Sequence, residues 1–125
     1  MTTRTIRDPK GITVNKEAEN LRQVVIDIHQ LIKPFYSRQT AAYTTSGNAG
    51  YEIVDVDSSS AITVSLHKSP SDGQQVITKR MGSGAVTVDT EGAETIDGSA
   101  SKAISAQYSS LGVIYLDSAG EWVVI

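Results

Sequence analysis

The chain has 125 residues, no cysteine and a net charge of −3 at pH 7. Its length corresponds to one domain, or to a small domain with an attached helix. The lack of cysteine excludes disulfides and thiol chemistry, and no apolar run reaches the ~18 residues needed to span a bilayer. Residues 1–7 lack the apolar region of a signal peptide, so export by that route is not expected.

Charge is divided unevenly along the chain. Residues 1–40 carry seven Lys or Arg against four Asp or Glu, whereas residues 41–125 carry four against ten. This division suits a molecule whose basic end docks on an acidic surface, although chance variation in a short chain explains it equally well. The candidate docking residues are Arg4, Arg7, Lys10 and Lys16.

The first third of the chain predicts an arm and a helix. Residues 1–14 show no helical period and predict an extended arm. Residues 15–36 predict an amphipathic helix that begins after the N-cap Asn15 and is ended by Pro34. The apolar positions recur every three or four residues and form one stripe, at Leu21, Val24, Val25, Ile28, Leu31 and Ile32. This stripe packs either on the β-domain of its own chain or against its copies on a threefold axis, and both arrangements stay open.

The rest of the chain predicts β-structure. Residues 37–50 are rich in Ser, Thr, Ala and Gly and predict a linker loop. Residues 51–125 contain seven or eight short β-prone runs at about ten-residue spacing, which is typical of an antiparallel β-sandwich or jelly roll. Gly82–Gly84 is expected to be a flexible hairpin connection. The predicted core residues are Val64, Leu66, Tyr115, Trp122 and Val124.

No group of residues predicts a reaction, so no enzymatic activity and no cofactor are expected. His29 and His67 are expected at exposed positions, and no Gly-x-Ser-x-Gly motif accompanies them. Asp55 and Asp57 project to the same side of a strand, which admits a calcium ion, although solvated aspartates at strand ends are far commoner. The acidic β-region argues against nucleic-acid binding.

The closing stretch, residues 88–125, carries a recognisable pattern. Ile96-Asp97-Gly98 forms a turn, Tyr108 is placed in a strand, and Asp117-Ser118-Ala119-Gly120-Glu121-Trp122 forms a hairpin. This pattern resembles the carboxy-terminal β-module of bacteriophage virion proteins, including tail fibres, head fibres and capsid decoration proteins. The resemblance implies a virion structural protein whose β-domains form a trimeric knob.

Size selects among these proteins, because 125 residues cannot hold the attachment domain, shaft and tip of a tail fibre. We therefore expect a trimeric capsid decoration (cement) protein or head fibre that binds the major capsid protein. It would be made in the host cytoplasm, lie on the exterior of the virion and contact neither nucleic acid nor membrane. One alternative is a tail fibre or tail adaptor that contributes to host attachment. Another is a small carbohydrate-binding β-sandwich, in which Trp122 would contact the glycan.

Overall fold

The computed structural model describes residues 34–125, which form nine strands and, within that range, no helix. The mainly-β prediction is confirmed for this part of the chain. The predicted arm and most of the predicted helix lie outside the described residues. The strands are β1 (Phe35–Gln39), β2 (Tyr43–Thr44), β3 (Tyr51–Val56), β4 (Ile62–Leu66), β5 (Gln75–Arg80), β6 (Val86–Thr90), β7 (Ser101–Ile104), β8 (Ser110–Leu116) and β9 (Glu121–Val124).

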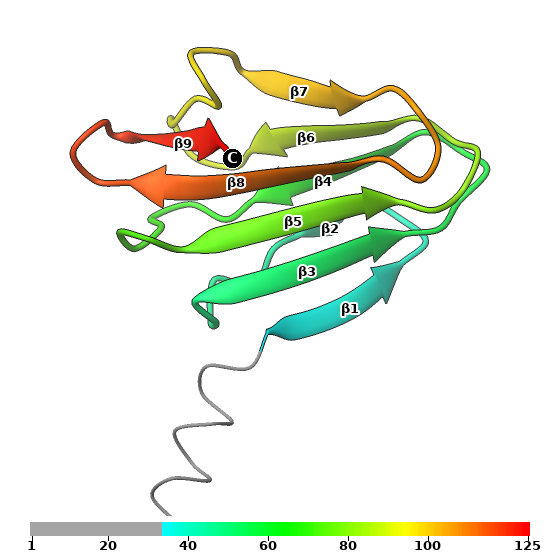
Figure 1. Cartoon of the computed structure of the whole chain (residues 1–125), viewed down its shortest axis with the longest axis horizontal. Coiled ribbons are helices and arrows are strands. Elements are labelled where there is room, and N and C mark those ends of the chain that lie inside the picture. The colour runs from blue at the N-terminus through cyan, green and yellow to red at the C-terminus, as the bar shows by residue number, and fades with distance from the viewer. Residues whose placement is uncertain (1–33) are drawn as a thin grey trace, which may run out of the picture. The chain divides into compact units, whose positions relative to one another are not determined.

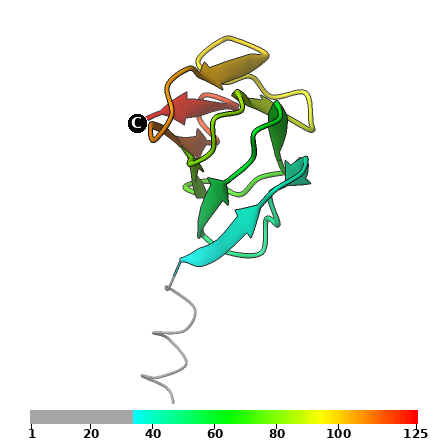
Figure 2. The same ribbon diagram turned by 90° about the vertical axis from the view of Figure 1, so that its right-hand side faces the viewer.

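The strands form two mixed sheets. Sheet A has the order β1-β3-β5-β8-β9, and sheet B has the order β2-β4-β6-β7. From β1 to β6 the chain alternates between the sheets, so that β1, β3 and β5 lie parallel in sheet A and β2, β4 and β6 lie parallel in sheet B (Figure 1). The six strands therefore make three successive coils, which Figure 2 shows from the side. The last three strands pair antiparallel and complete the sheets.

The expected antiparallel arrangement was thus wrong for the first six strands. Alternating polar and apolar residues indicate that a strand has one buried face, but they are the same in parallel and antiparallel sheets. The predicted linker at 37–50 also contains part of β1 and all of β2, which form the first coil. The described unit begins at Pro34.

The turns between the sheets stack on one another. The turn after β5 lies against the turn after β3, where Gly84 N–H donates to Ser58 O at 2.8 Å. A Cβ on Gly82 would lie 2.2 Å from Ser58 O, and one on Gly84 would lie 2.0 Å from Ser60 O. Gly82–Gly84 is therefore a tightly packed crossing from one sheet to the other, and not the flexible hairpin expected, because the backbones approach too closely for any side chain.

The core lies between the sheets. Inward positions of both sheets contribute aliphatic side chains, and Trp122 of β9 is fully buried among them. The predicted core residues Val64, Leu66, Tyr115 and Trp122 are buried, and Val124 is partly buried against the same cluster. A core shared by both sheets holds the outer faces of the sheets in fixed positions.

Candidate interaction surface

The outer faces of the two sheets differ in chemistry. On sheet B the outward positions carry small or polar residues, as expected for a face in water. The strand register places them in two rows, one of Thr63, Thr87 and Ala103 and one of Thr44, Ser65, Asp89 and Ser101.

The outer face of sheet A is apolar along its middle. The strand register aligns Tyr36, Ile53, Ile77 and Gly112 across four strands. The chain end continues this line, since Ile125 N–H donates to Gly112 O at 2.9 Å. A Cβ on Gly112 would lie 3.6 Å from Ile77 Cγ1 and 3.4 Å from Ile125 Cγ1, so the two isoleucines flank the glycine. We call these five residues the apolar row.

The apolar row is accessible in the described unit. Tyr36 is 57% exposed and Ile125 is 66% exposed, while Ile53 and Ile77 are half-buried by their neighbours on the sheet. Ile114 and Val123, paired in the neighbouring line, widen the apolar area on the β8–β9 side. Contiguous exposed apolar surface on a folded domain marks sites of interaction.

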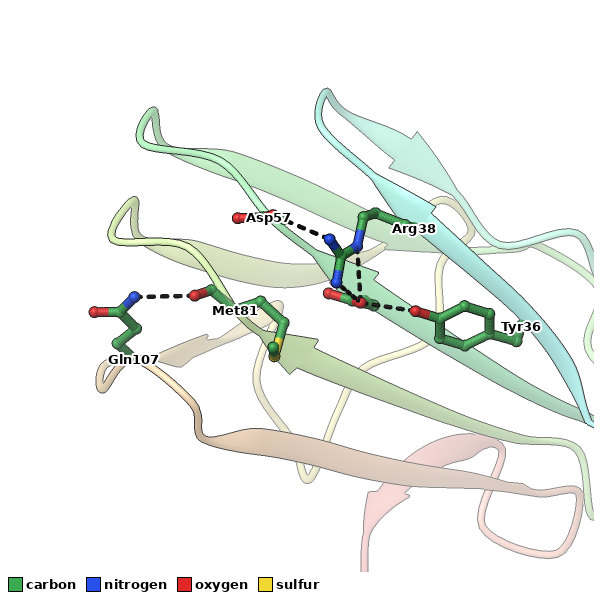
Figure 3. Close-up of polar contacts among 6 residues, drawn as sticks. Tyr36, Arg38, Asp57, Met81 and Gln107 are labelled. Carbon is green, nitrogen blue, oxygen red and sulfur yellow. Dashed lines mark hydrogen bonds and ion pairs between the residues drawn. The ribbon is translucent and has the colours of Figure 1, made fainter.

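A charged row runs beside the apolar row. It consists of Arg38, Asp55 and Lys79, which are aligned across β1, β3 and β5. Arg38 donates to Asp55 Oδ2 through Nε at 3.0 Å and Nη2 at 2.8 Å, and its Nη1 lies 3.2 Å from Asp57 Oδ2 (Figure 3). Tyr36 Oη donates to the same Asp55 oxygen at 2.8 Å. This hydrogen bond raises the pKa of the Tyr36 phenol, because an ionised phenolate could not donate it.

These contacts change the interpretation of the two aspartates. Asp55 is buried and neutralised by Arg38, in contrast to the solvated strand-end position expected, and only Asp57 is exposed. Among residues 34–125, no group of three or more potential ligands of the His, Cys, Asp or Glu type comes together to hold a metal ion.

The turn that precedes β8 lies next to the charged row. Lys79 Nζ donates to the carbonyl oxygen of Tyr108. Figure 3 shows the neighbouring contact, in which Gln107 Nε2 donates to Met81 O at 2.9 Å. Tyr108 is 62% exposed and has a φ of 70°. A bulky side chain rarely occupies this left-handed region, and such residues concentrate at functional sites. The expected strand position of Tyr108 is corrected to a turn.

The other residues of the closing pattern are structural. Ile96 is fully buried and forms a bridge with Trp122, while Asp97 N–H donates to Trp122 O at 2.9 Å. Glu121 Oε1 accepts hydrogen bonds from Thr95 Oγ1 at 2.9 Å and from Gly98 N–H at 2.8 Å. The turn and the hairpin thus hold each other in place. These contacts explain why these residue types occur together.

His67 belongs to a buried polar network, which the sequence did not predict. Thr45 Oγ1 accepts from the His67 backbone N–H at 2.9 Å and forms a second hydrogen bond with His67 Nδ1 at 2.6 Å. His67 Nε2 then donates to Gln74 Oε1 at 2.9 Å, and the Gln74 amide donates to Gly47 O and Ala49 O.

The linked side chains of Thr45, His67 and Gln74 resemble the nucleophile, base and orienting group of a hydrolase. However, there is no room for a substrate beside them. Thr45 is 3% exposed, and a Cβ on Gly47 would lie 2.8 Å from His67 Cδ2. The three side chains satisfy one another and anchor the loops that precede β3 and β5. Their role is structural.

A buried carboxylate supports the first coil in a similar way. Glu52 is 1% exposed and accepts hydrogen bonds from Tyr43 Oη at 2.7 Å and from Ser46 N–H at 3.0 Å. Burial, together with the hydrogen bond to Glu52, raises the pKa of Tyr43 to about 12. This contact links the outermost strand of sheet B to sheet A.

The sequence-predicted docking residues and the helix stripe lie outside the described residues. These are Arg4, Arg7, Lys10 and Lys16, and Leu21, Val24, Val25, Ile28, Leu31 and Ile32.

The apolar row was missed, although the sequence contains a signal for it. The sheet A strands carry adjacent apolar pairs, as in Ile53-Val54, Val76-Ile77 and Val113-Ile114, whereas β4 and β6 of sheet B alternate strictly. An adjacent pair places one apolar side chain on each face of a strand. Sheet A was therefore recognisable as apolar on both faces.

Comparison with protein-family models and with curated proteins finds no match to this chain. Within the described residues, the structure has no helix with the length and hydropathy required to cross a membrane.

Proposed function

We propose that this protein is a bacteriophage virion structural protein, a trimeric capsid decoration or head-fibre protein that binds and stabilises the exterior of the capsid. The observation that carries the proposal is the contrast between the outer faces of the sheets. One face is polar, and the other bears the apolar row, which is a surface for contact with protein. Such a surface suits an assembly protein better than an enzyme.

The distribution of charge supports the proposed orientation on the capsid. Residues 34–125 contain five Lys or Arg and ten Asp or Glu, whereas residues 1–33 contain six against four. In the proposal, the basic arm and the amphipathic helix engage the major capsid protein, and the acidic β-unit projects into solvent. Trimerisation would join three arms in one body and raise their combined affinity.

The closing pattern supports the proposal only through the resemblance to virion proteins. Ile96 and Trp122 are buried, and Asp97 and Glu121 form hydrogen bonds that hold the turn and the hairpin together. The arm and the outer face of sheet A are our candidates for contacts with other virion proteins.

Capsid co-sedimentation tests the proposal. Replacing Arg4, Arg7, Lys10 and Lys16 by Ala should abolish binding to purified capsids of the bacteriophage that encodes the chain. The mass of the oligomer in solution should not change. The control removes two positive charges from the described unit, through Lys68→Ala and Lys102→Ala, and should bind as the wild type does. Full binding by the arm variant would contradict the proposal.

One observation favours host attachment as a second function, in which the chain is part of a tail fibre or tail adaptor. Tyr108 and Tyr36 are exposed aromatic side chains of the kind that recognise other surfaces. In that case Tyr108→Ser should reduce adsorption of the labelled protein to host cells, whereas a capsid decoration protein would not adsorb at all.

The carbohydrate-binding alternative loses its expected contact. Trp122 has no exposed surface and packs edge-to-face against Tyr115, so it cannot stack on a sugar. We do not propose this function.

A further inference from the structure

We propose that the outer face of sheet A is the surface through which copies of this chain associate. The apolar row of each copy then faces the apolar rows of the other two copies across the threefold axis. This inference rests on the proposed trimer and deepens it, because it names the residues at which the protomers meet.

The first argument is the extent of the apolar row. Tyr36, Ile53, Ile77, Gly112 and Ile125 cross all of sheet A, from its first edge strand to the end of the chain after its last. Gly112 has no side chain, so Ile77 and Ile125 beside it form the surface at this point. An apolar face offers little to a sugar or a nucleotide, which need hydrogen bonds, and it suits contact with another apolar face.

The second argument is the balance of charge on this face. Arg38 and Lys79 carry two positive charges, and Asp55 with Asp57 carries two negative ones, and Arg38 contacts both aspartates directly. A strongly charged partner would gain little from such a surface. Copies of the chain can approach here without net repulsion.

The third argument concerns the rest of the unit. Residues 34–125 carry a net excess of five acidic residues, none of which arises from the four charges of the face. The outward rows of sheet B carry Asp89 and no basic residue, so copies that met through that face would bring like charges together. The electrostatically neutral, apolar face is therefore the favoured region of self-contact.

Sedimentation equilibrium of matched variants tests the inference. Ile77→Glu places a charge in the middle of the apolar row, and Thr87→Glu places the same charge at an outward position of β6 on sheet B. We expect wild type and Thr87→Glu to sediment as trimers of the 13.3 kDa chain. Ile77→Glu should sediment as a monomer, with self-association weakened by about 100-fold or more, because the interface would have to bury an unpaired charge.

A second measurement keeps the test decisive if Ile77→Glu does not fold. The chain contains no cysteine, so a single introduced thiol can cross-link only to another copy. Ile77→Cys should form a covalent dimer under mild oxidation, because residue 77 of one copy would lie beside residue 77 of another. Thr87→Cys should stay monomeric on a denaturing gel.

The outcomes separate this inference from the proposed function. A wild-type monomer would overturn the inference and the trimer together. A trimeric Ile77→Glu protein, or the absence of a cross-link in the Ile77→Cys variant, would overturn the inference alone. Loss of capsid binding by Ile77→Glu with unchanged mass would assign the face to the capsid protein, which overturns the inference and leaves the proposed function intact.

Discussion

The ring of Trp122 meets the ring of His67 edge-on, with centroids 5.5 Å apart and planes at 88°. Trp122 belongs to the last strand of sheet A, and His67 follows directly after β4 of sheet B. The contact therefore joins the closing hairpin to the second coil across the core. The hydrogen bonds of His67 to Thr45 and Gln74 fix the ring that Trp122 packs against.

The burial of Trp122 predicts a large loss of stability on truncation. Trp122→Ala should cost about 3–5 kcal/mol of unfolding free energy, because it removes a fully buried ring and its contacts with His67 and Tyr115. Urea denaturation followed by circular dichroism measures this cost. Tyr108→Ala is the control, since that ring is exposed, and it should change stability by no more than about 0.5 kcal/mol. Equal stability of the two variants would contradict the described packing.

The stacked turns predict that Gly84 cannot be replaced. Gly84→Ala should destabilise the protein by about 3 kcal/mol or more, since the added methyl would overlap the backbone of Ser60. Gly50→Ala is a matched control, because a Cβ at Gly50 meets no atom within 4 Å among the described residues. Thermal melting of both variants tests the difference. Similar melting temperatures would show that the turns do not stack as described.

The network around His67 predicts a cost from orphaned polar groups. His67→Leu should destabilise the protein by about 2–4 kcal/mol, because Thr45 and Gln74 would stay buried without their partner. The double variant with Gln74→Leu should lose less than the sum of the two single variants, which a double-mutant cycle measures. Strict additivity would show that the two side chains act independently.

The Tyr43–Glu52 hydrogen bond predicts a stability loss in alkaline solution. Tyr43 donates only as a neutral phenol, and its pKa of about 12 in the folded protein exceeds the ordinary value of about 10. The stabilisation is therefore complete below about pH 10 and is lost as the pH rises towards 12. The urea midpoint of the wild type should fall over this range relative to that of Tyr43→Phe. A constant difference between the two midpoints would exclude Tyr43 as the cause.

The sequence was informative about strands and poor about their partners. The alternation in Ile62–Leu66 predicted a strand with one buried face, and the closing hairpin correctly predicted Tyr115 and Trp122 as core residues. Pairing was harder, because a strand pattern does not record whether its neighbour is near or distant in the sequence. Residues 51–66 and 75–90 are equivalent at a spacing of 24 residues, since Tyr51 pairs with Gln75 and Leu66 with Thr90. Two equivalent segments are too few to stand out as a sequence repeat, so the sequence predicted an antiparallel sheet and not successive coils.

The candidate surface and the polar networks were less accessible to prediction. His67 ends a strand beside Lys68, which suggested an exposed edge, and only the fold brings Thr45 and Gln74 around its ring. Asp55 was predicted to be solvated, but strand β1 places Arg38 beside it. Thr45 and Arg38 come from the first coil, 22 and 17 residues before their partners, so local sequence could not reveal these contacts.

The constant 24-residue spacing between the second and third coils has a consequence for the length of the molecule. A duplication of residues 51–74 would add one strand to each sheet and preserve every pairing on either side of it. Each duplication would lengthen the stack by the distance between neighbouring strands, about 4.8 Å, while the closing hairpin stayed unchanged. The architecture can therefore grow in discrete steps, and a short knob and a longer spike differ only in the number of copies of one segment.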